Sequence, residues 1–260
     1  MIELAVDGAV ATIVLARPPL NALNPEWVAR FGELLDTIES SRDVAVVRIR
    51  SGERVFCAGA DLAFMTANFG SVQGRANIHA FVVSVQRVFA RLEALPVTSI
   101  AQIEGPAVGG GLELALACDF RLIADTASVA LPEVNLGLIP GAGGTQRLTR
   151  IAGPSVARRL ILGGRPVLGA EAVSLRICDW VEHRADIEAA AAALASRLSA
   201  FPRDAMSACR RCIVAAGSAD RDGFKEELDA TAALLESATT HERVRAFLNR
   251  NAARRAGEKG

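Results

Sequence analysis

Two isolated glutamates are the first candidates for chemistry in this chain. Glu113 is the only charged residue in AVGGGLELALAC (107–118), and Glu133 is the only one between Asp125 and Arg147. Burial penalises the charged form of a carboxyl group and raises its pKa. A carboxyl group whose pKa is close to neutrality can act as a general acid or base, and two of them can act as a pair. The alternative is that each glutamate has a structural role, as a hydrogen-bond acceptor, as a partner in an ion pair or as an acidic residue at the start of a helix.

Glycine-rich segments lie next to both glutamates. Three glycines precede Glu113, and GAGG (141–144) follows Glu133. Glycine lets a ligand approach the backbone closely, and a helix that begins near Gly110 directs unpaired N–H groups beyond its N-terminus. A further run, Ala58–Asp61 in FCAGADL, offers consecutive backbone N–H groups. Together with the Gly110 amide it could form a two-donor oxyanion hole, and an ordinary strand-to-helix loop is the alternative.

These segments need an α/β framework to position them. A hairpin is predicted at 2–15 with its turn at Asp7-Gly8, and Asn24 followed by Pro25 predicts the start of a helix. Further strands are expected at 44–51, 97–105 and 119–125, and further helices at about 75–95 and from Gly110 or Gly111. Alternating strands and helices predict a parallel sheet with crossover helices. From about residue 154 onward the patterns predict helices only.

The composition excludes several classes of protein. The 260 residues carry a formal net charge of zero, which gives no broad basic field for nucleic acid or an anionic membrane. The apolar runs are too short for a membrane span, and the first residues do not resemble a secretion signal. The five scattered cysteines suit a reducing compartment, so we expect a cytoplasmic protein.

The motifs resemble those of the enoyl-CoA hydratase/isomerase (crotonase) superfamily over nearly the whole chain. The matching segments are, in order, RPPLNALN, FCAGADL, GPAVGGGLELALACDFRLIA, PEVNLGLIPGAGGTQRL and GRPVLGAEAVSLRICDWV. The interval between Glu113 and Glu133 is the one that the hydratases use. The resemblance implies an α/β crotonase fold. Residues 1–195 would form a spiral core of repeated ββα units with an acyl-CoA site, and 196–260 a helical C-terminal trimerisation region.

The resemblance also implies a role for individual residues. The amides of Ala60 and Gly110 would hold the thioester carbonyl oxygen, while Glu113 helps water attack C3 and Glu133 delivers a proton to C2. The residues expected to contact the substrate, its CoA moiety or the water are Ala22, Ala58, Asp61, Leu62, Ala63 and Gly141. The implied reaction is reversible syn hydration of a trans-2-enoyl-CoA to a 3-hydroxyacyl-CoA. It needs no metal or redox cofactor, and the implied assembly is a homotrimer or homohexamer.

Other functions stay open at this point. A Δ3,Δ2-enoyl-CoA isomerase needs one glutamate to move a proton between C2 and C4, and a non-catalytic CoA-binding paralogue needs neither. The arginine-rich tail (243–260) suits contact with CoA or, less well given the neutral charge, with RNA. Ala63 stands where many hydratases have a lysine, so Arg17 or the tail arginines are the candidates for the CoA phosphates. Cys209 and Cys212 in CRRC are interpreted as two small buried or half-buried residues and not as a zinc site.

Overall fold

A six-stranded sheet is the framework of residues 1–200 in the computed structural model, which describes the backbone of residues 1–257 and the side chains of residues 1–250. Its strands, in spatial order, are β1 (Ile2–Asp7), β2 (Val10–Leu15), β3 (Val46–Ser51), β4 (Thr98–Ile103), β6 (Phe120–Ala124) and β9 (Trp180–Glu182). The first two strands are antiparallel, and every later pairing is parallel. The expected hairpin and parallel sheet are therefore confirmed. Because Asp7 pairs with Val10, the hairpin turn consists of Gly8 and Ala9.

A small second sheet brings the two glutamate segments together. It consists of β5 (Ala107–Val108), β7 (Ser128–Ala130) and β8 (Val167–Leu168). The strands β5 and β7 run parallel, with Val108 opposite Ala130, and the Gly109 N–H donates to the Ala130 carbonyl at 2.9 Å. The chain therefore leaves two neighbouring strands in the same direction, toward Glu113 in one case and toward Glu133 in the other.

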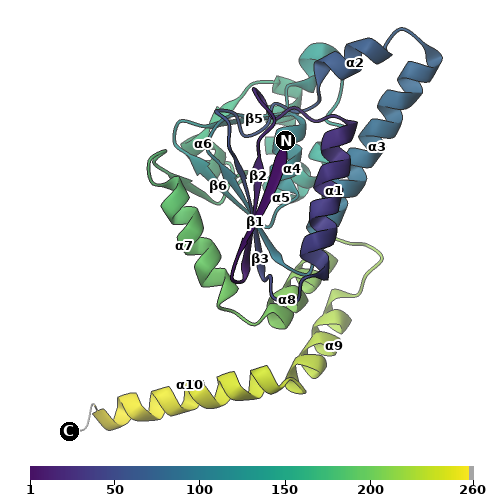
Figure 1. Ribbon diagram of the computed structural model, residues 1–260. Coiled ribbons are helices and arrows are strands. Elements are labelled where there is room, and N and C mark those ends of the chain that lie inside the picture. The colour runs from purple at the N-terminus through teal and green to yellow at the C-terminus, as the bar shows by residue number, and fades with distance from the viewer. Residues whose placement is uncertain (258–260) are drawn as a thin grey trace. The chain divides into compact units, whose positions relative to one another are not determined.

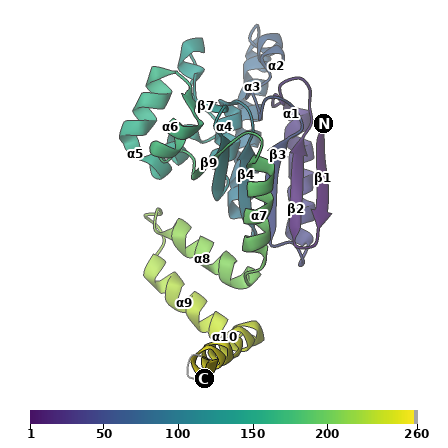
Figure 2. The ribbon, with the colours of Figure 1, turned by 90° about the vertical axis from the view of Figure 1, so that its left-hand side faces the viewer.

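Helices cover both faces of the large sheet, with α7 on one side and α1 and α3 on the other (Figure 1). Figure 2 shows α7 in front of the sheet, where it packs against the strands β3 and β4. The helix α1 begins as expected, since the Asn24 side chain accepts a hydrogen bond from the Trp27 N–H and Pro25 is the first helical residue. The helices of residues 1–200 are α1 (Pro25–Ser40), α2 (Leu62–Asn68), α3 (Val72–Ala94), α4 (Gly110–Leu116), the 3-10 turn η1 (Glu133–Leu136), α5 (Gly144–Gly163), α6 (Gly169–Ser174) and α7 (Ile187–Ser199).

The expectation that only helices follow residue 154 is wrong. Both β8 and β9 lie in this part of the chain, where β8 pairs with β7 and β9 adds to the edge of the large sheet beside β6. Strands of two and three residues are too short to show the alternation of side chains by which a strand is recognised. Their pairing with strands formed earlier in the chain is what defines them.

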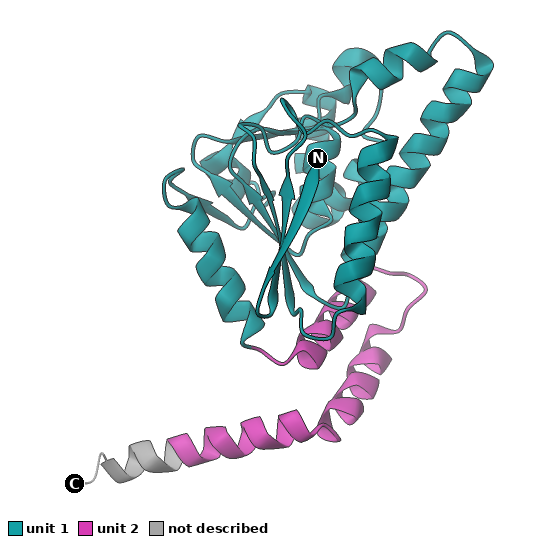
Figure 3. Ribbon diagram, in the orientation of Figure 1, with its two compact units in different colours: residues 1–200 teal, residues 201–260 magenta. Residues whose placement is uncertain are grey.

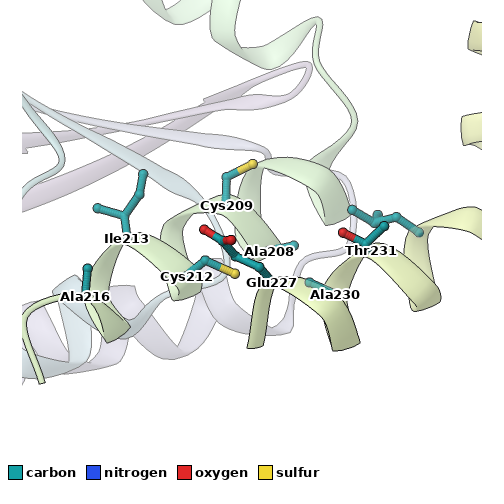
Figure 4. Close-up of a pocket in the computed structure, with 9 residues that line it drawn as sticks. Ala208, Cys209, Cys212, Ile213, Ala216, Glu227, Ala230 and Thr231 are labelled. Carbon is teal, nitrogen blue, oxygen red and sulfur yellow. The ribbon is translucent and has the colours of Figure 1, made fainter. Parts of the chain in front are cut away.

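Residues 201–260 form a second compact unit (Figure 3). It consists of α8 (Arg203–Ala215), α9 (Gly223–Leu235) and α10 (Ala238–Gly257), and α8 packs against α9. The two helices enclose a groove of about 550 Å³ that contains Cys209 and Cys212 (Figure 4). Cys212 is half-buried whereas Cys209 is exposed. Within the described part of the chain, no helix has the length and apolar character needed to cross a bilayer.

Candidate active site

Glu113 lies in α4, a helix whose residues are all buried. Only 2% of Glu113 is exposed, and its Oε1 atom accepts hydrogen bonds from the backbone N–H groups of Ala142 (2.8 Å) and Gly144 (2.7 Å). Gly144 allows this approach, because a Cβ atom at that position would lie 2.9 Å from the Glu113 Oε1. The glycine-rich loop 141–144 therefore acts as a backbone cradle for the Glu113 carboxylate.

Burial raises the pKa of Glu113 to about 7. The neighbouring charge of Glu133 raises this pKa further, while the two amide donors and the positive charge of Arg147 oppose the rise. Both protonation states of Glu113 are therefore accessible near neutral pH, as a general acid or base requires.

Glu133 is the first residue of η1 and shares this environment with Glu113. Its Oε1 atom lies above Gly109, where a Cβ atom would be only 2.9 Å away, and Gly109 has a positive φ of 53° that favours glycine. Its Oε2 atom is buried and has no hydrogen-bond partner among the described residues. Burial also raises the pKa of Glu133. An unpartnered buried carboxyl oxygen of this kind is available to a substrate or a water.

The amides of Ala60 and Gly110 lie next to each other. A Cβ atom on Gly110 would be 3.8 Å from the Ala60 nitrogen, and one on Gly59 would be 3.0 Å from the Gly110 nitrogen. Neither N–H donates to an acceptor within the described residues. The loop that carries Ala60 is fixed by backbone bonds on both sides, since Leu23 N–H donates to Gly59 and Val108 N–H donates to Cys57. Two adjacent amides without acceptors among the described residues, one on this fixed loop and one at the first residue of α4, have the arrangement of an oxyanion hole.

Of the other expected contact residues, Asp61 has a structural role in the fold. Its carboxylate accepts from Ala63 N–H at the start of α2 and pairs with Arg17 at 2.7 Å, which lowers the pKa of Asp61. Arg17 also donates to the Ala22 carbonyl at 2.8 Å. Both terminal nitrogens of Arg17, one of the candidates for the CoA phosphates, thus donate to groups of the protein itself. Leu62 is exposed at the first turn of α2.

The remaining expected residues differ in exposure. Ala63 is exposed beside Leu62, whereas Ala22 and Ala58 are half-buried. The Gly141 carbonyl accepts a hydrogen bond from Gln86 on α3 at 2.6 Å. Among the tail arginines, Arg254 and Arg255 have side chains that lie outside the described residues.

Sequence reasoning missed the side chains that support this site. Asn21, which is fully buried, donates to Ser51 and to the carbonyl of Phe56, so it fixes the start of the Ala60 loop. Arg147 is buried between Glu93 of α3 and the carbonyl of Ala142. The available signal for Arg147 was a cation three residues after Gly144 and next to the apolar Leu148.

The geometry therefore combines two carboxyl groups of raised pKa with two free backbone amides. The carboxyl groups can take up and release protons, and the amides can stabilise negative charge that develops on a carbonyl oxygen. This set of groups suits proton transfer and addition next to a polarised carbonyl.

Comparison with known proteins identifies relatives along the whole chain. The family model described as "Enoyl-CoA hydratase/isomerase" matches residues 5–256. A protein of Bacillus subtilis (strain 168) named "Probable enoyl-CoA hydratase" is 34% identical over 259 residues, which are 99% of each chain. The "Short-chain-enoyl-CoA hydratase" of Clostridium acetobutylicum is 35% identical over 194 residues, or 74% of this chain and 72% of that protein. The crystal structure of an enoyl-CoA hydratase from Bacillus anthracis superposes with a TM-score of 0.89 at 30% identity and covers 96% of both chains.

Proposed function

Because the chain belongs to the enoyl-CoA hydratase/isomerase family and has the crotonase fold, we propose that it catalyses the reversible syn addition of water to a trans-2-enoyl-CoA. The product is a 3-hydroxyacyl-CoA. The observation that carries this proposal is the convergence of Glu113 and Glu133, both with raised pKa, near two unpartnered amides. The names of the relatives support the same reaction class.

In the proposed mechanism, the amides of Ala60 and Gly110 donate to the thioester carbonyl oxygen. Negative charge grows on this oxygen as water adds to C3, so the two hydrogen bonds strengthen in the transition state. Ionised Glu113 removes a proton from the attacking water, while protonated Glu133 donates its proton to C2. The new C3–O and C2–H bonds replace the C2=C3 π bond, and subsequent proton exchange restores the two glutamates.

The two backbone N–H groups that donate to Glu113 favour its ionised form, which supports its role as the base. Burial raises the pKa of Glu133, which supports its role as the acid, and its Oε2 atom has no hydrogen-bond partner among the described residues. Hydration is redox-neutral and these groups supply both the acid and the base, so we propose that no metal or redox cofactor takes part. Coenzyme A enters as part of the substrate.

We further propose a cytoplasmic homotrimer or homohexamer. The five cysteines are all free, which supports a reducing compartment. Large apolar side chains of residues 201–250 are exposed, among them Ile213, Phe224 and Leu228, which supports self-association.

The test is an absorbance assay of the conjugated thioester with crotonyl-CoA and a longer enoyl-CoA. We expect the wild type to consume at least one substrate, and Glu113→Gln or Glu133→Gln to lower kcat by about 10²–10⁴-fold. Glu33→Gln, which removes an exposed carboxylate on α1, is the matched control and should keep wild-type activity. Full activity in both site variants would refute the two-glutamate mechanism. Isomerisation of a 3-enoyl-CoA without hydration would identify an isomerase instead.

A further inference from the structure

Arg147 links the Glu113 cradle to α3. Its side chain is only 10% exposed. The Nη1 atom donates to the Ala142 carbonyl at 3.0 Å, while Nε and Nη2 donate to the Glu93 Oε2 at 3.1 and 2.9 Å. The chain leaves room for this guanidinium at Gly143, where a Cβ atom would lie 2.2 Å from Nη1 and where φ is 109°. An arginine is suited to this place because its planar fork can hold two partners at once.

The contact with Ala142 matters because both backbone groups of this residue are in use. Its carbonyl accepts from Arg147, and its N–H donates to the Glu113 carboxylate. The next donor to Glu113, the Gly144 N–H, lies two residues further along the same loop. The preceding residue, Gly141, is held through its carbonyl by Gln86. The loop that orients Glu113 is therefore fixed from α3 and α5.

We propose that Arg147, anchored by Glu93, is the positioning residue of Glu113: it fixes the loop 141–144 and supplies the positive charge that favours the ionised carboxylate. Arg147 acts through the loop and through its charge, without a role in the reacting bonds. The kinetic consequence rests on the hydratase function proposed above, whereas the effect on Glu113 itself does not.

The charges around Glu113 determine the direction of each expected change. Glu133 faces it from η1 and opposes its ionisation, whereas Arg147 faces it from α5 and favours ionisation. Glu93 on α3 lies behind Arg147 and partly neutralises that charge. Cys57, on the loop packed against Gly111 of α4, carries no charge near neutral pH because burial raises its pKa to about 12. The strands β4 and β5 that pack against α4 carry no titratable side chain.

Two substitutions should therefore shift the titration of Glu113 in opposite directions. Arg147→Met removes the positive charge and the Ala142 contact, so the pKa of Glu113 should rise by roughly half a unit or more. Glu93→Gln removes the compensating negative charge but keeps an oxygen acceptor for Arg147, so the pKa of Glu113 should fall. Arg147→Lys keeps the charge but cannot hold both partners, and should give a smaller rise than Arg147→Met.

The titration of Glu113 is measured on the full chain without substrate. Infrared difference spectra across the pH range report the protonated carboxyl band, and the same titration of Glu113→Gln identifies the band that belongs to Glu113. The matched control is Arg48→Met on β3, since the Arg48 side chain is 11% exposed and pairs with Glu188 at 2.9 Å. This variant loses a comparable ion pair and should leave the Glu113 band at its wild-type pH.

The kinetic measurement follows the acid limb of kcat for enoyl-CoA hydration. We expect this limb to move to higher pH in Arg147→Met and to lower pH in Glu93→Gln, in step with the infrared titrations. An unchanged Glu113 titration in both variants would overturn the proposal, whether or not the enzyme is active. Shifted titrations in a protein that hydrates no enoyl-CoA would keep the proposal and refute the hydratase function. If Arg147→Met does not fold, opposite shifts in Arg147→Lys and Glu93→Gln decide the matter.

Discussion

At the scale of single residues, the raised pKa of Glu113 has a consequence for stability as well as for catalysis. The ordinary value of 4.5 rises to about 7 in the folded protein. Between these two pH values the folded state binds more protons than the unfolded state, so the free energy of unfolding falls as the pH rises. One pKa unit corresponds to ~1.4 kcal/mol. Above pH 7 the ionised Glu113 carboxylate therefore lowers the free energy of unfolding by about 3 kcal/mol relative to pH values below 4.5.

Glu113→Gln should remove this pH dependence, because an amide does not ionise. We expect its unfolding free energy to fall less between pH 4.5 and pH 7 than that of the wild type. Urea unfolding at a series of pH values measures the difference. Glu33→Gln, an exposed position, should retain the wild-type slope. If the free energy of unfolding changed with pH equally in Glu113→Gln and in the wild type, the result would contradict the raised pKa of Glu113.

At the scale of elements, the short parallel pair β5–β7 aligns α4 with η1, and Gly109 is the residue between β5 and α4. Gly109→Ala would combine an unfavourable positive φ with a Cβ atom 2.9 Å from the Glu133 Oε1. We expect a loss of kcat of at least tenfold, because Glu133 must move. Gly8→Ala is the matched control. Gly8 has a φ of 54° but no atom within 4 Å of its added Cβ.

The control separates strain from displacement of the carboxylate. Both variants should lose about 1 kcal/mol of stability from backbone strain, measured by urea unfolding. Only Gly109→Ala should lose activity beyond the change in stability. Equal activities in the two variants would show that the position of Glu133 does not depend on Gly109.

The elements that the sequence predicted are those with a local signature. Asn24 and Pro25 define the start of α1, and the alternation in 2–15 defines a hairpin, because both depend on residues close in the chain. Glu113 and Glu133 were recognised as a pair because each is an isolated charge in an apolar segment. Their catalytic roles stay predictions.

Contacts between distant residues could not be predicted in this way. The strands β8 and β9 are defined by their pairing with β7 and β6, respectively. Each has only two or three residues, which is too few for an alternating pattern that would predict a strand. Arg147 meets Glu93 from 54 residues away, so neither local sequence indicates the ion pair. Arg17 was one of the candidates for the CoA phosphates, but the fold joins it to Asp61. These contacts follow from the way the chain is packed, which the sequence pattern alone does not specify.

At the scale of the whole molecule, the helical unit of residues 201–260 has little core of its own. Among its side chains that the structure describes, only those of Ala208 and Ala215 are buried. Phe224 is 85% exposed, and Ile213 and Leu228 are 73% and 72% exposed. Such concentrated apolar exposure is uncommon in a monomer and favours burial against another molecule. The groove between α8 and α9 (Figure 4) adds apolar surface to the same helices.

We therefore expect the wild type to form an oligomer larger than the 27.3 kDa chain. The double variant Phe224→Asp/Leu228→Asp should dissociate, because two carboxylates placed in a buried apolar interface would each lose hydration without a partner. Light scattering over a range of protein concentrations measures the mass. Ala29→Asp, at an exposed position of α1, is the matched control and should keep the wild-type mass. A wild-type mass of one chain at every concentration would contradict the proposed assembly, since the exposed side chains on α8 and α9 would then remain in water.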